Sequence, residues 1–211
     1  MKFMGFEHKS RIYTEQLNFL EPILNEWVRV NRDIREQTGT NLNWFNERAN
    51  LSALAGAVWR CGGVAVEEYS SPKGEEGSMG RIDLFFKFNN KAVICESKHR
   101  WLFLPSYLDG KDFIGEIERD LELENCNAKD DISHTLQSRK NKCDFGLAIT
   151  YYVPYWKGSE SRHQALGLKK QIEELKCDFY AYLECTGFDP LVNSKGEGYS
   201  SILMVGHVHK E

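Results

Sequence analysis

Apolar residues recur at spacings of three and four in two stretches of the N-terminal part, which is the pattern of helices with one buried face. The first predicted helix spans residues 12–36, and Gly39 follows it as a stop signal. Its apolar stripe consists of Leu17, Leu20, Ile23, Leu24, Trp27 and Val30. The second predicted helix spans residues 45–61, with Asn46 as its N-cap and the glycine pair 62–63 as its end. Two helices therefore precede the first predicted strand.

Shorter runs rich in β-branched and aromatic residues predict strands. Three of them follow one another at 64–70, 81–88 and 91–98. A long Gly-rich turn, 71–80, separates the first two, and the pair Asn89–Asn90 makes a tight turn between the second and the third. We expect these strands to form an antiparallel meander.

The apolar run at residues 144–153 continues without alternation, which predicts a strand buried on both faces. The other predicted elements are a charged helix over 113–142 with a break near 125–131, a helix over 161–176, and strands over 178–186 and 200–208 joined by the loop 187–199.

This order of elements predicts one α/β domain of 211 residues, in which helices flank a central mixed sheet. Residues 1–44 are expected to form a helical extension. Residues 45–155 form the core, with the meander followed by a helix and a strand. Residues 156–211 supply a C-terminal helix and strands. No internal repeat or linker divides the chain.

The charge balance limits how the chain could bind nucleic acid. It carries 27 Lys and Arg against 31 Asp and Glu, a formal charge of −4. Proteins that coat nucleic acid by charge alone are usually basic. Any such contact must therefore come from a local basic patch or from bound metal ions.

Cysteine spacing and hydropathy indicate the compartment. The six cysteines form no CxxC pair and lie mostly in apolar segments, so we expect small buried residues in a reducing environment, with neither a zinc site nor a disulfide framework. The first sixteen residues contain no apolar core of a signal peptide, and no apolar run reaches the length of a membrane span. These features predict a soluble cytoplasmic protein.

Three charged residues interrupt the apolar strands of the meander. Asp83 lies in the second strand, and Glu96 and Lys98 lie two residues apart in the third, so that their side chains share a face. Asp83 and Glu96 are equidistant from the centre of the Asn89–Asn90 turn, which places them opposite one another. Two facing carboxylates repel each other unless a cation lies between them. Either this is a solvated sheet face with Lys98 as a salt partner, or it is a site.

As a site, the set suits phosphodiester hydrolysis. Carboxylate oxygens are ligands that Mg²⁺ prefers, usually together with waters and substrate phosphate. An ammonium beside the ion, from Lys98, can orient a water and offset charge on a pentacovalent phosphate. The bare spacing of Glu96 and Lys98 recurs elsewhere in the chain, and only this copy lies on an apolar strand after a hairpin that carries an Asp.

In these residues the chain resembles the PD-(D/E)XK nuclease superfamily, which has the restriction-endonuclease-like fold. The motif reads Arg81-Ile82-Asp83 and then Glu96-Ser97-Lys98, with Ile82 in place of the proline. The resemblance covers about residues 45–155 and is closest to the Holliday-junction-resolvase and Mrr-like members. It implies that Asp83, Glu96 and the backbone carbonyl of Ser97 bind Mg²⁺ or Mn²⁺, that Lys98 is catalytic, and that Glu47 contacts the metal or water.

Several residues near the motif could have either a functional or a structural role. Glu47 also suits ordinary capping chemistry in a first helical turn, and Glu68 could supply a third carboxylate in its place. The residues that flank the motif and could grip phosphates are Lys73, Arg81, His99 and Arg100. The aromatic residues Trp101, Phe103 and Tyr107 could stack on unpaired bases, although core packing is the more common role of such residues.

The sequence therefore predicts a metal-dependent nuclease with no membrane partner, and it favours DNA over RNA as the substrate. The alternative is a catalytically inactive module of the same fold that serves in binding or assembly. A third possibility is a subunit of a larger defence or restriction complex, in which a partner supplies recognition. A homodimer would suit cleavage of both strands.

Overall fold

The computed structural model describes residues 3–8, 12–42, 45–73, 78–103, 112–137, 143–157, 172–184, 196–199 and 201–210. Its helices are α1 (Thr14–Thr38), α2 (Glu47–Arg60) and α4 (Phe113–Gln137). Its strands are β1 (Phe3–His8), β2 (Val64–Lys73), β3 (Ser78–Phe88), β4 (Lys91–Phe103), β5 (Phe145–Lys157), β6 (Phe179–Glu184), β7 (Glu197–Tyr199) and β8 (Ser201–His209).

The strands form one eight-stranded mixed sheet in the order β1-β6-β8-β5-β4-β3-β2, with β7 paired to β5. The predicted meander is confirmed, because β2, β3 and β4 are successive antiparallel neighbours. Strand β5 then pairs with β4 in parallel, and α4 is the crossover between them. The sheet is therefore mixed, with helices on its faces, as the sequence predicts.

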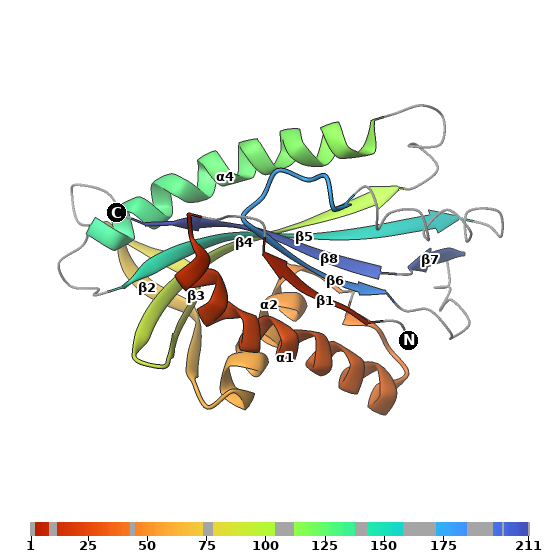
Figure 1. Ribbon diagram of the computed structural model, residues 1–211, viewed down its shortest axis with the longest axis horizontal. Coiled ribbons are helices and arrows are strands. Elements are labelled where there is room, and N and C mark those ends of the chain that lie inside the picture. Colours follow the sequence, from red (N-terminus) through yellow and green to blue (C-terminus); the bar gives the residue numbers. More distant parts are fainter. Residues whose placement is uncertain are drawn as a thin grey trace.

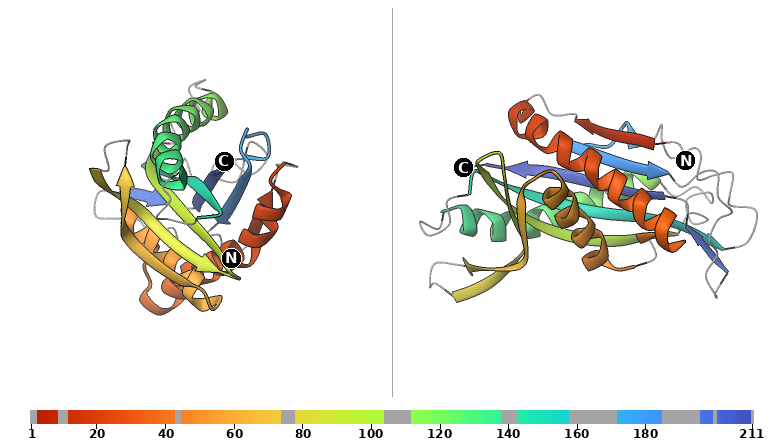
Figure 2. Two further views of the ribbon diagram at one scale, coloured as in Figure 1. Left: turned by 90° about the vertical axis from the view of Figure 1, so that its left-hand side faces the viewer. Right: turned by 90° about the horizontal axis from the view of Figure 1, so that it is seen from below.

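The helices divide between the two faces of the sheet: α1 and α2 lie on one, and α4 lies on the other (Figures 1 and 2). Residues Trp27 and Val58 belong to a core cluster under α1 and α2, together with Phe86 and Val93 of the meander. The stripe of α4 packs on the opposite face in two clusters that include Leu121 and Ile132. Both faces of the central strands are thus buried, which explains the unbroken apolar pattern of β5.

The caps of the first two helices agree with the sequence signals. Helix α1 ends at Gly39, whose φ of 70° is left-handed and whose amide donates to the carbonyl of Arg35 at 3.0 Å. Helix α2 begins after Asn46, whose side chain accepts a hydrogen bond from the amide of Ala49 at 3.4 Å. This cap fixes where Glu47, the first residue of α2, lies.

The structure corrects several predicted boundaries. Helix α4 runs without the break expected near 125–131, because Ala128 is buried and continues the apolar stripe to Ile132. The long turn expected at 71–80 is largely strand, since β2 and β3 pair as far as Lys73 and Ser78.

Two strands have no counterpart in the sequence analysis. Strand β1 lies in the segment expected to be a helical extension and pairs with β6, and β7 lies in the segment expected to be a loop. The predicted helix at 161–176 falls outside the described residues up to position 171.

Among the described helices, none combines the length and the apolar character that crossing a membrane requires. The five cysteines that the structure describes are free thiols. Of these, Cys95 is buried, Cys126 is exposed and the other three are half-buried, so the expectation of buried cysteines is met by Cys95 alone.

Candidate functional site

The β3–β4 hairpin sets the register of the candidate site. Both turn residues, Asn89 and Asn90, have left-handed φ values, 45° and 63°, which suit a tight two-residue turn. The ladder runs from this turn to the pair Leu84 and Cys95, as symmetry about the turn requires. The next residues on each strand are Asp83 and Glu96, the two predicted metal ligands.

Beyond the pair Leu84 and Cys95, the side chain of Asp83 links β3 to β4. Its Oδ2 accepts a hydrogen bond from the backbone amide of Ser97 at 2.7 Å and contacts the Ser97 hydroxyl at 3.3 Å. Ser97 is completely buried. Beyond the ladder, β3 stays paired with β2 while β4 stays paired with β5. The carboxylate of Asp83 thus lies between the two strands, against the middle residue of the Glu96-Ser97-Lys98 motif.

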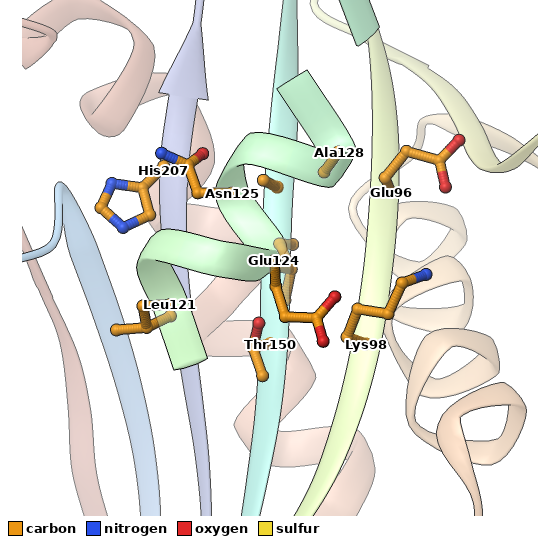
Figure 3. A pocket seen from close by; sticks show the side chains of 10 residues that line it. Glu96, Lys98, Leu121, Glu124, Asn125, Ala128, Thr150 and His207 are labelled. Atoms are coloured by element: carbon orange, nitrogen blue, oxygen red, sulfur yellow. The ribbon is translucent and has the colours of Figure 1, made fainter. Parts of the chain in front are cut away.

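Lys98 reaches back to the same residue. Its Nζ donates to the carbonyl oxygen of Ser97 at 2.8 Å. Figure 3 shows the charged ends of Glu96 and Lys98 pointing to the same side of β4, away from Leu121 and Asn125. Glu96 is only 6 % exposed. The predicted common direction of these two side chains is therefore present in the structure.

Helix α2 brings Glu47 to this group. Burial raises the pKa of Glu47 above its usual range, while the ammonium of Lys98 acts against this shift and the charge of Asp83 adds to it. A hydrogen bond from Ser97 also acts on the Glu47 carboxyl. Glu47 therefore belongs to the same electrostatic cluster, although it is far from the motif in the sequence.

Burial, and then the negative charges of the site, raise the pKa values of two groups, Cys95 and Tyr151. Burial raises the pKa of the Cys95 thiol well above its usual value, and the charges of Asp83, Glu96 and Glu47 raise it further. The Tyr151 phenol responds in the same way, first to burial and then to nearby negative charge that includes Glu47 and Asp83. The charges of Asp83, Glu96 and Glu47 thus all act on Cys95, and the charge of Lys98 acts in the opposite direction.

The oxygen donors at this point suit a hard cation. Two carboxylates and a backbone carbonyl match the ligands that Mg²⁺ takes, with waters to complete the shell. Within the described part of the chain, no group of three or more His, Cys, Asp and Glu side chains is arranged to hold a metal ion. The two predicted ligands Asp83 and Glu96 therefore belong to no such group of three among the described residues.

Glu68 contacts two arginine side chains. Its two carboxylate oxygens accept from the guanidiniums of Arg48, at 2.7 Å, and Arg81, at 3.1 Å. Both arginine side chains are exposed. Arg81, one of the residues expected to contact phosphate, thus lies at the surface in an ion pair with Glu68.

Arg100 lies against α4. It forms an ion pair with Glu124, which is buried, and a longer one with Asp120 at 4.0 Å. Its side chain ties β4 to the helix on the α4 face of the sheet. The side chain of Lys73, another residue expected to grip phosphate, lies outside the described part of the structure.

His99 is partly buried beside Trp101, with their ring centroids 4.7 Å apart. Burial lowers the pKa of His99 to about 4, so that its imidazole is neutral at pH 7. Trp101 itself is 44 % exposed, so it is not a core residue. Tyr107 lies outside the described residues.

A small cavity separates the motif from α4. Its volume is about 10 Å³, at the lower limit for one water molecule. Glu124, Thr150 and His207 contribute polar side chains to its lining, and Lys98 also lines it although its ammonium points away from Leu121 and Asn125 (Figure 3). The cavity is too small for a substrate and adds polar surroundings to the back of the site.

Neither Arg48 nor Glu124 is predicted as a site residue from the sequence. Arg48 directly follows Glu47 in the first turn of α2, and that adjacency is the one available signal. Glu124 belongs to an acidic stretch in which no single residue stands out.

Comparison of the chain with protein-family models, with curated proteins and with solved structures finds no match.

Proposed function

We propose that the protein is a Mg²⁺- or Mn²⁺-dependent nuclease that hydrolyses phosphodiester bonds in DNA. The observation that carries the proposal is the contact of the Asp83 carboxylate with Ser97, since it brings the acid of β3 to the Glu96-Ser97-Lys98 motif of β4. The resemblance of these motifs to the PD-(D/E)XK superfamily supports the same reading.

Asp83, Glu96 and the carbonyl of Ser97 would hold the ion. When bound, it supplies Lewis-acid polarisation of the scissile phosphate and lowers the pKa of a bound water. The chain needs such an ion for a further reason, because the converging carboxylates would repel a phosphodiester that approached them alone.

Lys98 and Glu47 have complementary roles in this proposal. The ammonium of Lys98, which rests on the Ser97 carbonyl, orients the attacking water and offsets the negative charge that develops on the phosphorane. The carboxylate of Glu47, held at the same serine, accepts a hydrogen bond from the water. Lys98 hydrogen-bonds to the carbonyl of Ser97 and Glu47 to its side chain, so both groups would act next to the same residue.

The second candidate function is that of a non-catalytic module with the same fold. The formal charge of −4 favours it, because an acidic chain has little general attraction for DNA. So does the small donor set, because Asp83 and Glu96 belong to no group of three possible ligand side chains in the described part of the chain.

The deciding experiment is a cleavage assay with purified protein. Plasmid, linear duplex and single-stranded DNA are incubated with Mg²⁺ or Mn²⁺, and wild type is compared with Lys98→Ala and Lys91→Ala. Lys91 is the matched control, since it lies on the same strand and pairs with Glu15 at the other end. We expect Lys98→Ala to lower the rate by about 10²–10⁴-fold and Lys91→Ala to leave it unchanged. Equal background rates for all three proteins would contradict the enzymatic reading.

A further inference from the structure

Three charged side chains from three different elements form a cluster beside Asp83. Glu68 of β2 accepts one hydrogen bond on each carboxylate oxygen, from Arg48 of α2 on Oε1 and from Arg81 of β3 on Oε2. The carboxylate therefore bridges two guanidiniums. A phosphate group, with its oxygens similarly spread, can bridge the same pair.

The backbone places this cluster next to the candidate site. In the β2–β3 ladder the pairs Glu67 with Leu84 and Tyr69 with Ile82 flank the position of Glu68, so Glu68 lies opposite Asp83. The φ of Glu68 is 54°, a left-handed value that costs free energy in a residue with a Cβ. Strained conformations of this kind cluster at active sites and ligand-binding sites.

Stability does not explain the cluster. Arg48 and Arg81 are each 72 % exposed, and Glu68 is 39 % exposed. Ion pairs at this degree of exposure contribute little to folding. Each guanidinium has five N–H donors, and a contact to one carboxylate oxygen uses one of them.

The cluster could attract nucleic acid despite the formal charge of −4 of the chain. Within this cluster two guanidiniums face one carboxylate, so the three side chains together carry one positive charge in an acidic chain. An acidic nuclease needs such a local patch to attract a polyanion.

We propose that Arg48 and Arg81 bind a backbone phosphate of the nucleic-acid strand, next to the phosphate cleaved at Asp83. Glu68 occupies the place of that phosphate in the free protein and yields it when the strand binds. The inference rests on the proposed nuclease function for its substrate, but binding alone tests it.

The test measures the affinity for a fluorescent single-stranded oligonucleotide and for a duplex, in Ca²⁺ and over a range of salt concentrations. Arg48→Gln and Arg81→Gln are compared with Arg60→Gln. Arg60 is the matched control, because it lies at the other end of α2 and also bridges two acids, Glu26 and Asp33.

We expect each of the Arg48 and Arg81 variants to weaken binding about three- to tenfold and to lower the slope of log K against log salt by about one. Arg60→Gln should leave both quantities unchanged. Glu68→Gln should strengthen binding severalfold, because it removes the competing anion, whereas Glu26→Gln should not. Circular dichroism checks that each variant is folded.

The inference is overturned if the Arg48 and Arg81 variants bind like Arg60→Gln, or if wild type binds neither oligonucleotide at low salt. It is also overturned if inorganic phosphate shifts the NMR signals of both arginines while oligonucleotide binding does not depend on them, since the cluster would then take free phosphate. A protein that binds through these arginines but cleaves nothing would support the cluster and contradict the nuclease function, so the two failures are distinguishable.

Discussion

The carboxylate of Asp83 on β3 accepts a hydrogen bond from the backbone amide of Ser97 on β4, over 2.7 Å. The amide is that of a fully buried residue, so it needs an acceptor, and the acid provides one where the backbone ladder ends. One side chain thereby serves the fold and the proposed chemistry at once.

Variants of Asp83 should separate these two roles. In Asp83→Asn the amide oxygen can still accept from Ser97, so the free energy of unfolding should change by less than about 1 kcal/mol. In Asp83→Ala the buried amide loses its acceptor, and we expect a loss of about 1–3 kcal/mol. Both variants should lose metal-dependent cleavage. Urea unfolding measures the difference, and an Asn variant as unstable as the Ala variant would show that charge rather than hydrogen bonding holds the strands.

Glu47 should stabilise the protein when it is neutralised. Its pKa is raised in the folded state, mainly by burial. The folded protein thus favours the protonated acid, and this contribution is lost as the pH rises through the raised pKa. Glu47→Gln should therefore be more stable than wild type at pH 7 but not below the usual pKa of a glutamate, while its cleavage rate falls.

The rate of the wild type should depend on the same group. If Glu47 must be ionised, the acidic limb of the pH–rate profile lies above the usual glutamate range. Glu47→Gln should lack this limb. An unchanged limb in the variant would remove Glu47 from the proposed mechanism.

His99 should contribute to acid sensitivity. Burial lowers its pKa to about 4. The unfolded chain therefore takes up a proton near the usual histidine pKa, about 6.5, that the folded protein takes up only near pH 4. This contribution to stability is present above about pH 6.5 and is lost as the pH falls toward 4. The urea midpoint of His99→Gln should depend less on pH in this window than that of wild type, and parallel curves would contradict the assignment.

The ion pair of Arg100 with Glu124 should act on stability rather than on DNA binding. Arg100→Met leaves the buried Glu124 without its partner, and we expect a loss of about 2 kcal/mol, less than for a fully buried pair because Arg100 is 42 % exposed. Adding Glu124→Met should recover most of this loss. A reduced salt dependence of oligonucleotide binding in Arg100→Met would instead support a phosphate contact.

The sequence predicted those features that depend on short-range pattern. The stripe of α1 and the cap at Asn46 are local signals, and so is the hairpin turn at Asn89–Asn90. Because that turn fixes the register as far as the pair Leu84 and Cys95, it also places Asp83 and Glu96 at the next positions, where the ladder ends. The α/β class and the antiparallel meander followed from these elements.

Features that depend on tertiary contacts were not predictable in the same way. Strand β1 has no alternating apolar pattern, and its pairing with β6, almost the whole chain away, defines it. The break expected in α4 is absent because burial of Ala128 against the sheet outweighs the weak helical propensity of the residues around it.

The site shows the same limit. Spacing along a strand placed Glu96 and Lys98 together, but it could not show that Asp83 reaches the amide of Ser97. Nor could it show that Glu68 is held by two arginines, or that Arg100 faces α4. These contacts depend on where the strands part, which no local pattern encodes.

The central claim is that Asp83 and Glu96 share one divalent cation. Calorimetric titration of the protein with Mn²⁺ tests it most directly, with Asp83→Asn and Glu96→Gln as variants and Asp33→Asn as the matched control, since Asp33 is an acid on α1 paired with Arg60. We expect wild type and the control to bind Mn²⁺ at one common site, and each of the two site variants to lose that binding. Mn²⁺ binding that persists in both site variants, or that is absent from wild type, would contradict the account.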